Sequence, residues 1–137
     1  MALKPDDTTI ADWLLLGAAG AGGAIARYLI HAIVAPTARG AFPWSTLAIN
    51  CAGSFAFGLV TVLAETNGVL SPRARVVVLT GFLGAFTTFS TFAFENAELL
   101  RLGHTARAMA NILAQNLGAI VCVFAGAATA RGVLGGG

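Results

Sequence analysis

The densest group of chemically useful side chains lies in residues 81–92, which read GFLGAFTTFSTF within a long apolar segment. Glycine weakens a helix interior by about 1 kcal/mol relative to alanine. Backbone carbonyls freed at membrane depth need protein, water or an ion as a partner. Small residues also serve close helix packing, but the hydroxyl and phenylalanine run that follows the glycines is not needed for packing. The stretch therefore predicts a broken helix with an ion or substrate site near the middle of a membrane.

Two other segments carry polar side chains at helical spacing. Thr46 and Asn50 lie four residues apart, as do Asn111 and Gln115, so each pair shares one helix face. A polar side chain at membrane depth either hydrogen-bonds a neighbouring helix or faces a wet cavity. Two such faces on two segments favour the cavity, and we expect both pairs to line a pathway.

Arg27 is the only charged residue deep within an apolar segment. A charge at that depth is a functional hypothesis by default, the alternative being a side chain that reaches back to the interface. Together with hydroxyl and amide donors, an arginine suits an anion. The carboxylates Glu65, Glu95 and Glu98 lie at segment ends, where we expect them to meet water. A proton-coupled cation exporter, which needs a membrane carboxylate, is therefore less favoured.

The composition is that of a membrane protein. Of 137 residues, 57% are hydrophobic and 10% charged, with a mean hydropathy of +0.81, whereas soluble domains carry about a quarter charged residues. A net charge of +2 with scattered arginines gives no sign of nucleic-acid binding. The chain shows no catalytic constellation and no metal-ligand spacing, so we do not expect an enzyme. Cys51 and Cys122 fall inside apolar segments and are expected to be free thiols.

Four segments are long and apolar enough to cross a bilayer, which requires about 20 residues. They cover residues 13–34, 44–64, 76–99 and 108–130 and form one all-α domain over residues 1–137, with residues 129–137 expected as a frayed tail. Four spans enclose little pathway alone, so we expect an oligomer.

Three motifs together resemble the CrcB/Fluc fluoride channel family. They are GAxxRY from residue 23, TLxxNxxGSFxxG from residue 46 and GxxGxxTTFSTF from residue 81. The resemblance covers all four spans, and its third motif is the most specific. It implies a fluoride-selective channel that exports cytoplasmic fluoride down its gradient and lowers fluoride toxicity. It further implies a multi-pass protein of the cell membrane, here expected in a bacterial inner membrane.

The same resemblance implies roles for individual residues. The main-chain carbonyls of Gly84 and Thr87 from two subunits would hold one structural sodium ion, and Arg27 would lie near a vestibule. Phe89 and Phe92 would present positive ring edges to fluoride. The remaining pore lining would come from Asn50, Thr46, Ser90, Thr91, Asn111 and Gln115. In the family the last two positions are often Tyr and Ser, and a common glycine is replaced by Ala85, which leaves Gly81 and Gly84 to make the break.

The resemblance also implies a homodimer whose subunits insert in opposite orientations, and the loop charges agree with it. Orientation is set by lysines and arginines in short loops. One side of the membrane would carry four of these residues, namely Lys4, Arg73, Arg75 and Arg131. The opposite side would carry three, namely Arg39, Arg101 and Arg107. So small a bias predicts insertion both ways.

Two other functions remain open from the residues alone. A small multidrug-type exporter also has four helices and often forms dimers. A structural or assembly protein would transport no ion. Measurement of fluoride and cationic-drug transport separates the three.

Overall fold

The structure, a computed structural model, describes residues 8–35, 42–66 and 70–135. Within these ranges the chain is helical and contains no strand. Four stretches are long and apolar enough to cross a membrane: α1 (Ile10–Val34), α2 (Trp44–Glu65), the composite Pro72–Arg101 and α6 (Thr105–Gly135). The predicted all-α fold with four spans is confirmed.

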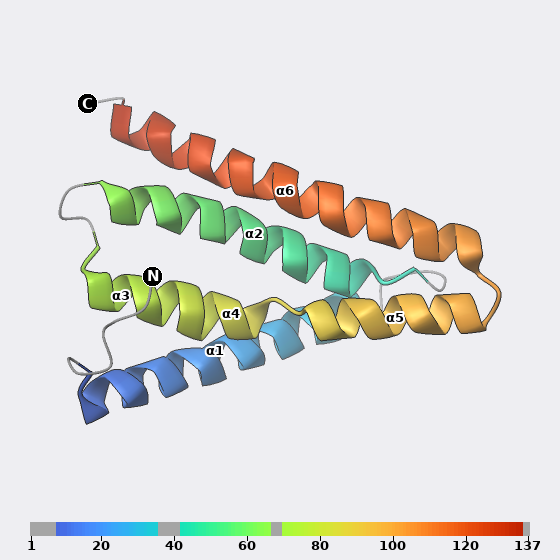
Figure 1. The fold of residues 1–137 in the computed structure, drawn as a ribbon, viewed down its shortest axis with the longest axis horizontal. Helices are drawn as coiled ribbons and strands as arrows, with labels where there is room; N and C mark the ends of the chain where they lie inside the picture. Colours follow the sequence, from blue (N-terminus) through green and yellow to red (C-terminus); the bar gives the residue numbers. More distant parts are fainter. Residues whose placement is uncertain (1–7, 36–41, 67–69, 136–137) are drawn as a thin grey trace.

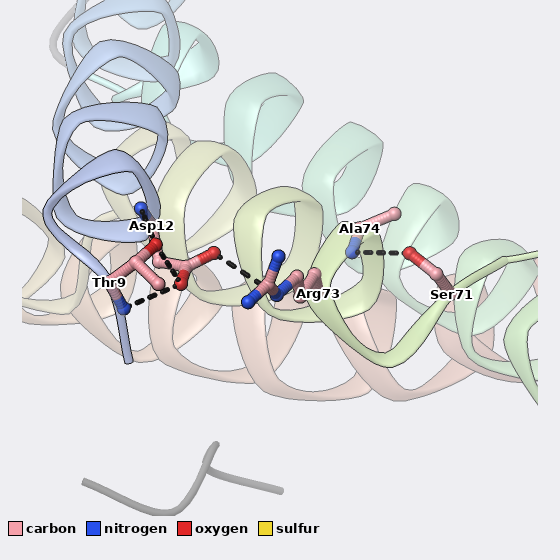
Figure 2. A network of polar contacts seen from close by, with 5 residues as sticks. All are labelled: Thr9, Asp12, Ser71, Arg73 and Ala74. Atoms are coloured by element: carbon pink, nitrogen blue, oxygen red, sulfur yellow. Dashed lines mark hydrogen bonds and ion pairs between the residues drawn. The ribbon is translucent and has the colours of Figure 1, made fainter. Parts of the chain in front are cut away.

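The first and third spans begin side by side at one end of the molecule (Figure 2). Thr9 caps α1, accepting from the Asp12 N–H at 3.4 Å, while the Asp12 carboxylate accepts from the Thr9 N–H at 2.8 Å. Arg73 Nε lies 3.4 Å from Asp12 Oδ1. Ser71 caps α3 through a 3.2 Å bond from the Ala74 N–H. These caps fix where both spans start, and the ion pair shows that they start on the same side.

The third span is built from four pieces. It runs through α3 (Pro72–Val76), the π-helical η2 (Val77–Leu83), α4 (Gly84–Phe86) and α5 (Phe89–Arg101). Figure 1 shows the non-helical link between α4 and α5. The predicted broken third helix is therefore confirmed.

The position of the break differs from the prediction that Gly81 and Gly84 make it. Gly81 lies within η2, and Gly84 is helical with φ −63° and ψ −35°. The chain leaves the helix at Thr87, where ψ is 157°, and Thr88 is extended with φ −148° and ψ 112°. Glycine weakens a helix, but the break forms where another element takes over the backbone hydrogen bonds, and here that element is α2.

Helices α2 and α6 form the closest helix pair and lie side by side in Figure 1. A Cβ added at Gly58 would lie 2.0 Å from the Val123 carbonyl oxygen, and one at Gly126 would lie 2.0 Å from that of Phe55. The two backbones therefore touch, as small residues allow in membrane helix pairs. On the other side of the third span, α1 packs against η2 and α4.

The core is small because most large apolar side chains face outward. Its main buried cluster consists of Ile49, Leu79, Leu83 and Phe86. Exposed apolar side chains run along α1 and α6, among them Leu14, Ile25, Leu29, Ile33, Leu117, Val121 and Phe124. A protein surrounded by lipid needs no polar coat, and these surfaces match a hydrocarbon environment.

Both ends of the last helix differ from the sequence expectation. Gly103, with φ 78°, makes the turn after α5, and α6 begins at Thr105. Residues 129–135, expected as a frayed tail, are helical within α6, so that expectation is wrong. Ala, Arg and Leu are good helix formers, and the Thr129 hydroxyl donates to the Ala125 carbonyl at 2.9 Å within the helix. Lys4 and Arg39, used in the charge comparison, lie outside the described residues.

Candidate ion pathway at the helix break

The Asn50 side chain hydrogen-bonds the backbone at the helix break. Its Oδ1 accepts from the Thr88 N–H at 2.9 Å, and its Nδ2 donates to the Thr88 carbonyl at 3.2 Å. The side-chain amide thus pairs with one extended residue as a neighbouring β-strand would. In a continuous helix the Thr88 N–H would donate to the Gly84 carbonyl instead. Asn50 therefore takes that donor and leaves the Gly84 carbonyl without it.

The Thr88 side chain starts the next helix. Its hydroxyl accepts from the Thr91 N–H at 3.3 Å and donates to the Thr91 hydroxyl at 2.9 Å. Ser90 is exposed, and its hydroxyl lies 3.4 Å from that of Thr88. Because the Thr91 N–H serves the cap, it is no longer available to the Thr87 carbonyl, its partner in an uninterrupted helix. Both carbonyls expected at the sodium site have therefore lost their helical donors.

A cavity of about 370 Å³ opens beside the break, and we call it the uncharged cavity. Among the described residues, its polar wall consists of Asn50, Ser54, Thr87, Thr88, Gln115 and Asn116, with no acidic, basic or histidine side chain. Phe89 and Phe92 form part of the remaining wall, their ring centroids 5.5 Å apart and their planes at 55°. Phe89 is 78% exposed although it lies near the middle of the span. Four predicted pore residues, from α2, α5 and α6, therefore meet in one place.

A second cavity, of about 300 Å³, lies on the other side of Thr88, which lines both. We call it the arginine cavity, because Arg27 lines it together with His31, Thr46 and Thr91. Arg27 makes no ion pair with any residue in the described ranges. Thr46 and Thr91, predicted in the pore with Asn50, thus belong to the cavity that holds Arg27.

Glu95 is the residue whose surroundings differ most from expectation. It was expected at a span end, in water. In the structure it accepts a 2.5 Å hydrogen bond from the Thr46 hydroxyl, and its Oε2 is buried without a partner among the described residues. Because α5 continues to Arg101, Glu95 lies inside the helix rather than at its end. Glu95 is thus hydrogen-bonded to a residue that lines the arginine cavity. The predicted span boundaries did not indicate a carboxylate at this place.

Asn111 lies behind the cavity wall rather than in it. It is fully buried, accepts from Gln115 Nε2 at 3.4 Å and donates to Asn96 Oδ1 at 3.2 Å. Gln115 in turn accepts from Asn50 Nδ2 at 2.8 Å. Asn96 and His31 were absent from the predicted site. Asn96 is a polar residue within an apolar segment and lies one turn after Phe92. This spacing places both residues on one helix face and could have indicated Asn96 as part of the site.

Residues 14–127 match the family described as "CrcB-like protein, Camphor Resistance (CrcB)". The chain belongs to this family. It is accordingly a multi-pass membrane protein, as its four apolar helices require.

Curated relatives of this CrcB-family chain carry the name "Fluoride-specific ion channel FluC". The one from Nitrosococcus oceani is 44% identical over 83% of this chain and 90% of its own length. The one from Chlorobaculum tepidum is 41% identical over 86% and 93%. FluC 1 of Symbiobacterium thermophilum is 49% identical over 72% and 81%. These relatives are named as ion channels, which favours neither an enzyme nor a drug exporter.

Proposed function

We propose that this chain forms a fluoride-selective channel through which cytoplasmic fluoride leaves a bacterial cell across its inner membrane. The observation that supports this best is the uncharged cavity at the helix break, where three phenylalanines and three side-chain amides converge. The setting is a chain of the CrcB family with relatives named as fluoride-specific channels.

The cavity suits a small anion that must enter and leave quickly. Fluoride loses much hydration on entering a narrow pathway, and conduction requires partners that replace it without binding too tightly. Amide N–H groups donate directly, and ring edges carry the positive end of an aromatic quadrupole. A buried cation would hold the ion more strongly, and none of the described residues that line the uncharged cavity is cationic. Arg27 stands in the neighbouring cavity, where it attracts anions without holding them in the pathway.

Fluoride efflux from liposomes containing the purified protein tests this function. Liposomes loaded with potassium fluoride should release fluoride to an electrode when valinomycin balances the charge, and chloride-loaded liposomes should release far less chloride. Protein-free liposomes provide the baseline. Equal release of both anions would contradict selectivity, and transport of a cationic drug without fluoride release would favour the exporter.

We further propose a homodimer of oppositely inserted subunits around a structural sodium ion. Gly84 is exposed at mid-span, and within the described part of the chain a Cβ there would meet only the Leu79 carbonyl oxygen, at 3.7 Å. A second copy can therefore approach the break closely. The Gly84 and Thr87 carbonyls, both relieved of their helical donors, supply oxygen ligands of the type that hard cations prefer. The same two carbonyls from each subunit would give four oxygens.

Sodium dependence of dimer stability tests this site. A cation bound only by the folded dimer stabilises it by mass action. Thermal dissociation in detergent should move to higher temperature when sodium replaces N-methylglucamine at constant ionic strength. Identical dissociation temperatures in the two salts would count against a sodium ion at the break.

Accessibility of single cysteines tests the orientation. In a background lacking Cys51 and Cys122, Ser71→Cys and His104→Cys place thiols at opposite ends of the third span, at exposed positions. If subunits insert both ways, each thiol should react with an impermeant reagent from both sides of sealed vesicles. Labelling from one side only would show a single orientation.

A further inference from the structure

Four side-chain amides form one continuous chain of hydrogen bonds through the protein. Asn50 donates to Gln115 at 2.8 Å, Gln115 to Asn111 at 3.4 Å, and Asn111 to Asn96 at 3.2 Å. Asn96 then donates to the Phe92 carbonyl at 2.7 Å. At the other end, Asn50 accepts from the Thr88 N–H. The chain of amides thus begins and ends on backbone groups that flank Phe89.

We propose that Asn96 and Asn111 are positioning residues that fix the N–H end of Gln115 at the uncharged cavity, while Asn50, anchored on Thr88, fixes its oxygen end. A side-chain amide can turn over and exchange its oxygen and nitrogen, so its direction follows from its partners. The two backbone ends cannot exchange, since Thr88 N–H only donates and the Phe92 carbonyl only accepts. Turning every amide over would place N–H against N–H at Thr88 and oxygen against oxygen at Phe92. Both ends therefore require the same direction.

The direction decides which hydrogens remain for an anion. An amide nitrogen carries two hydrogens. Those of Asn50 go to Gln115 and to the Thr88 carbonyl. Gln115 gives one to Asn111, and its second has no acceptor among the described residues. Because Gln115 lines the uncharged cavity, its second N–H is an amide donor available there without breaking the support of the helix break. Asn116 lines the same cavity and donates one N–H to the Ile112 carbonyl at 2.7 Å, but it does not belong to the amide chain.

Asn96 and Asn111 act at a distance from the cavity. Asn96 is 6% exposed, Asn111 is fully buried, and neither lines the uncharged cavity. The bond from Gln115 to Asn111 is the longest of the chain, so it is the bond most easily broken, whereas the bond from Asn50 to Gln115 is 2.8 Å long. Loss of Asn96 removes the acceptor of Asn111, whose side-chain amide is then held only by the 3.4 Å bond from Gln115. Gln115 keeps its 2.8 Å bond from Asn50 but loses a firmly placed acceptor for its own N–H.

Gln115 is the only glutamine in the sequence, so glutamine labelled with nitrogen-15 in its side chain gives one pair of amide proton signals. In the wild-type protein in lipid nanodiscs, sodium fluoride should shift one of the two protons much more than the other, and sodium chloride should shift neither. In Asn96→Leu, which removes no contact of Gln115, both signals should move and the fluoride-dependent shift should shrink. Unchanged Gln115 signals in Asn96→Leu would overturn the positioning role.

Transport provides the second measurement, and this inference rests on the proposed fluoride pathway. Asn96→Leu and Asn111→Leu should each lower fluoride flux about tenfold, the equivalent of one neutral hydrogen bond. The double variant Asn96→Leu with Asn111→Leu removes both members of the Asn111–Asn96 pair together, so it should be more stable than Asn111→Leu alone and should keep the low flux. Thr129→Val, which removes an exposed α6 hydroxyl bonded within its own helix, is the matched control and should conduct normally.

The two failures are separable. If the wild-type protein conducts no fluoride, the proposed function fails. If it conducts and the folded double variant conducts equally well, the pathway stands and the positioning role is overturned.

Discussion

The two cavities on either side of Thr88 differ in charge although they share a wall. The uncharged cavity offers amides, hydroxyls and the rings of Phe89 and Phe92. The arginine cavity is lined by Arg27, His31 and Thr46, and the Thr46 hydroxyl donates a hydrogen bond to Glu95. Charge acts over a Debye length of roughly 8 Å at physiological ionic strength, whereas ring edges and N–H groups act only on contact. The difference indicates that attraction of an anion and its close recognition occur in separate places.

Replacing the rings should give the largest effect. Phe89→Ile or Phe92→Ile keeps an apolar side chain but removes the positive ring edge, so fluoride efflux should fall nearly to the protein-free baseline. Phe94→Ile is the control, because Phe94 lies on the same helix, is 70% exposed and lines neither cavity. Wild-type efflux from both ring variants would make the uncharged cavity an ordinary packing gap.

Asn50→Asp should be the next most harmful change. An aspartate at residue 50 still accepts from the Thr88 N–H, but its second oxygen faces the Thr88 carbonyl and Gln115 Oε1, both acceptors. It also adds a negative charge to an anion pathway. Leaving charged and polar groups unpaired predicts a loss of flux of about a hundredfold. Efflux equal to the wild type would show that Asn50 does not organise the break.

Gly53→Ala tests how closely α2 approaches the break. A Cβ there would lie 2.3 Å from Thr87 Cγ2, and such overpacking costs about 1–3 kcal/mol of unfolding free energy. Denaturant unfolding in detergent measures it. Thr87→Ser removes the clashing methyl, so the pair Gly53→Ala with Thr87→Ser should recover most of the loss. Gly17→Ala is the control, because a Cβ at Gly17 meets no atom of the described residues within 4 Å.

Arg27→Met should have the smallest effect on transport. If Arg27 only concentrates anions in the arginine cavity, fluoride flux should fall roughly three- to tenfold at low ionic strength and less at high ionic strength. Arg27→Lys should retain most of the flux, and Arg107→Met, which changes an exposed arginine outside both cavities, should retain all of it. A loss independent of salt would place Arg27 in direct contact with the permeating ion.

Local sequence was sufficient for much of this molecule. Apolar length predicted four membrane helices, and the unusual run at residues 81–92 predicted that the third is broken. Spacing also placed Asn50 and Gln115 on polar helix faces. These features depend on neighbours along the chain, through hydrogen bonding within a helix and the partition of side chains into lipid.

The remaining features depend on which helices meet. Residue spacing gives the polar face of a helix, but the rotation of that face toward one neighbour or another comes from packing. The break lies at Thr87 and Thr88 rather than at Gly84, because Asn50, 38 residues earlier in the chain, accepts the hydrogen bond of the Thr88 N–H. For the same reason Thr46 faces Glu95 while Asn50, one turn away, faces Gln115.

The sequence by itself determined that this chain crosses a membrane four times and carries a weak point in its third helix. Only the tertiary structure decided where that helix opens, which amides stand in the cavity wall and which stand behind it. The physical reason is that a backbone donor in a membrane must always have a partner, and whether that partner is the same helix or a side chain of another depends on close contact between helices. The glycines of α2 and α6 permit that contact, which brings Asn50 of α2 within hydrogen-bonding distance of Gln115 of α6.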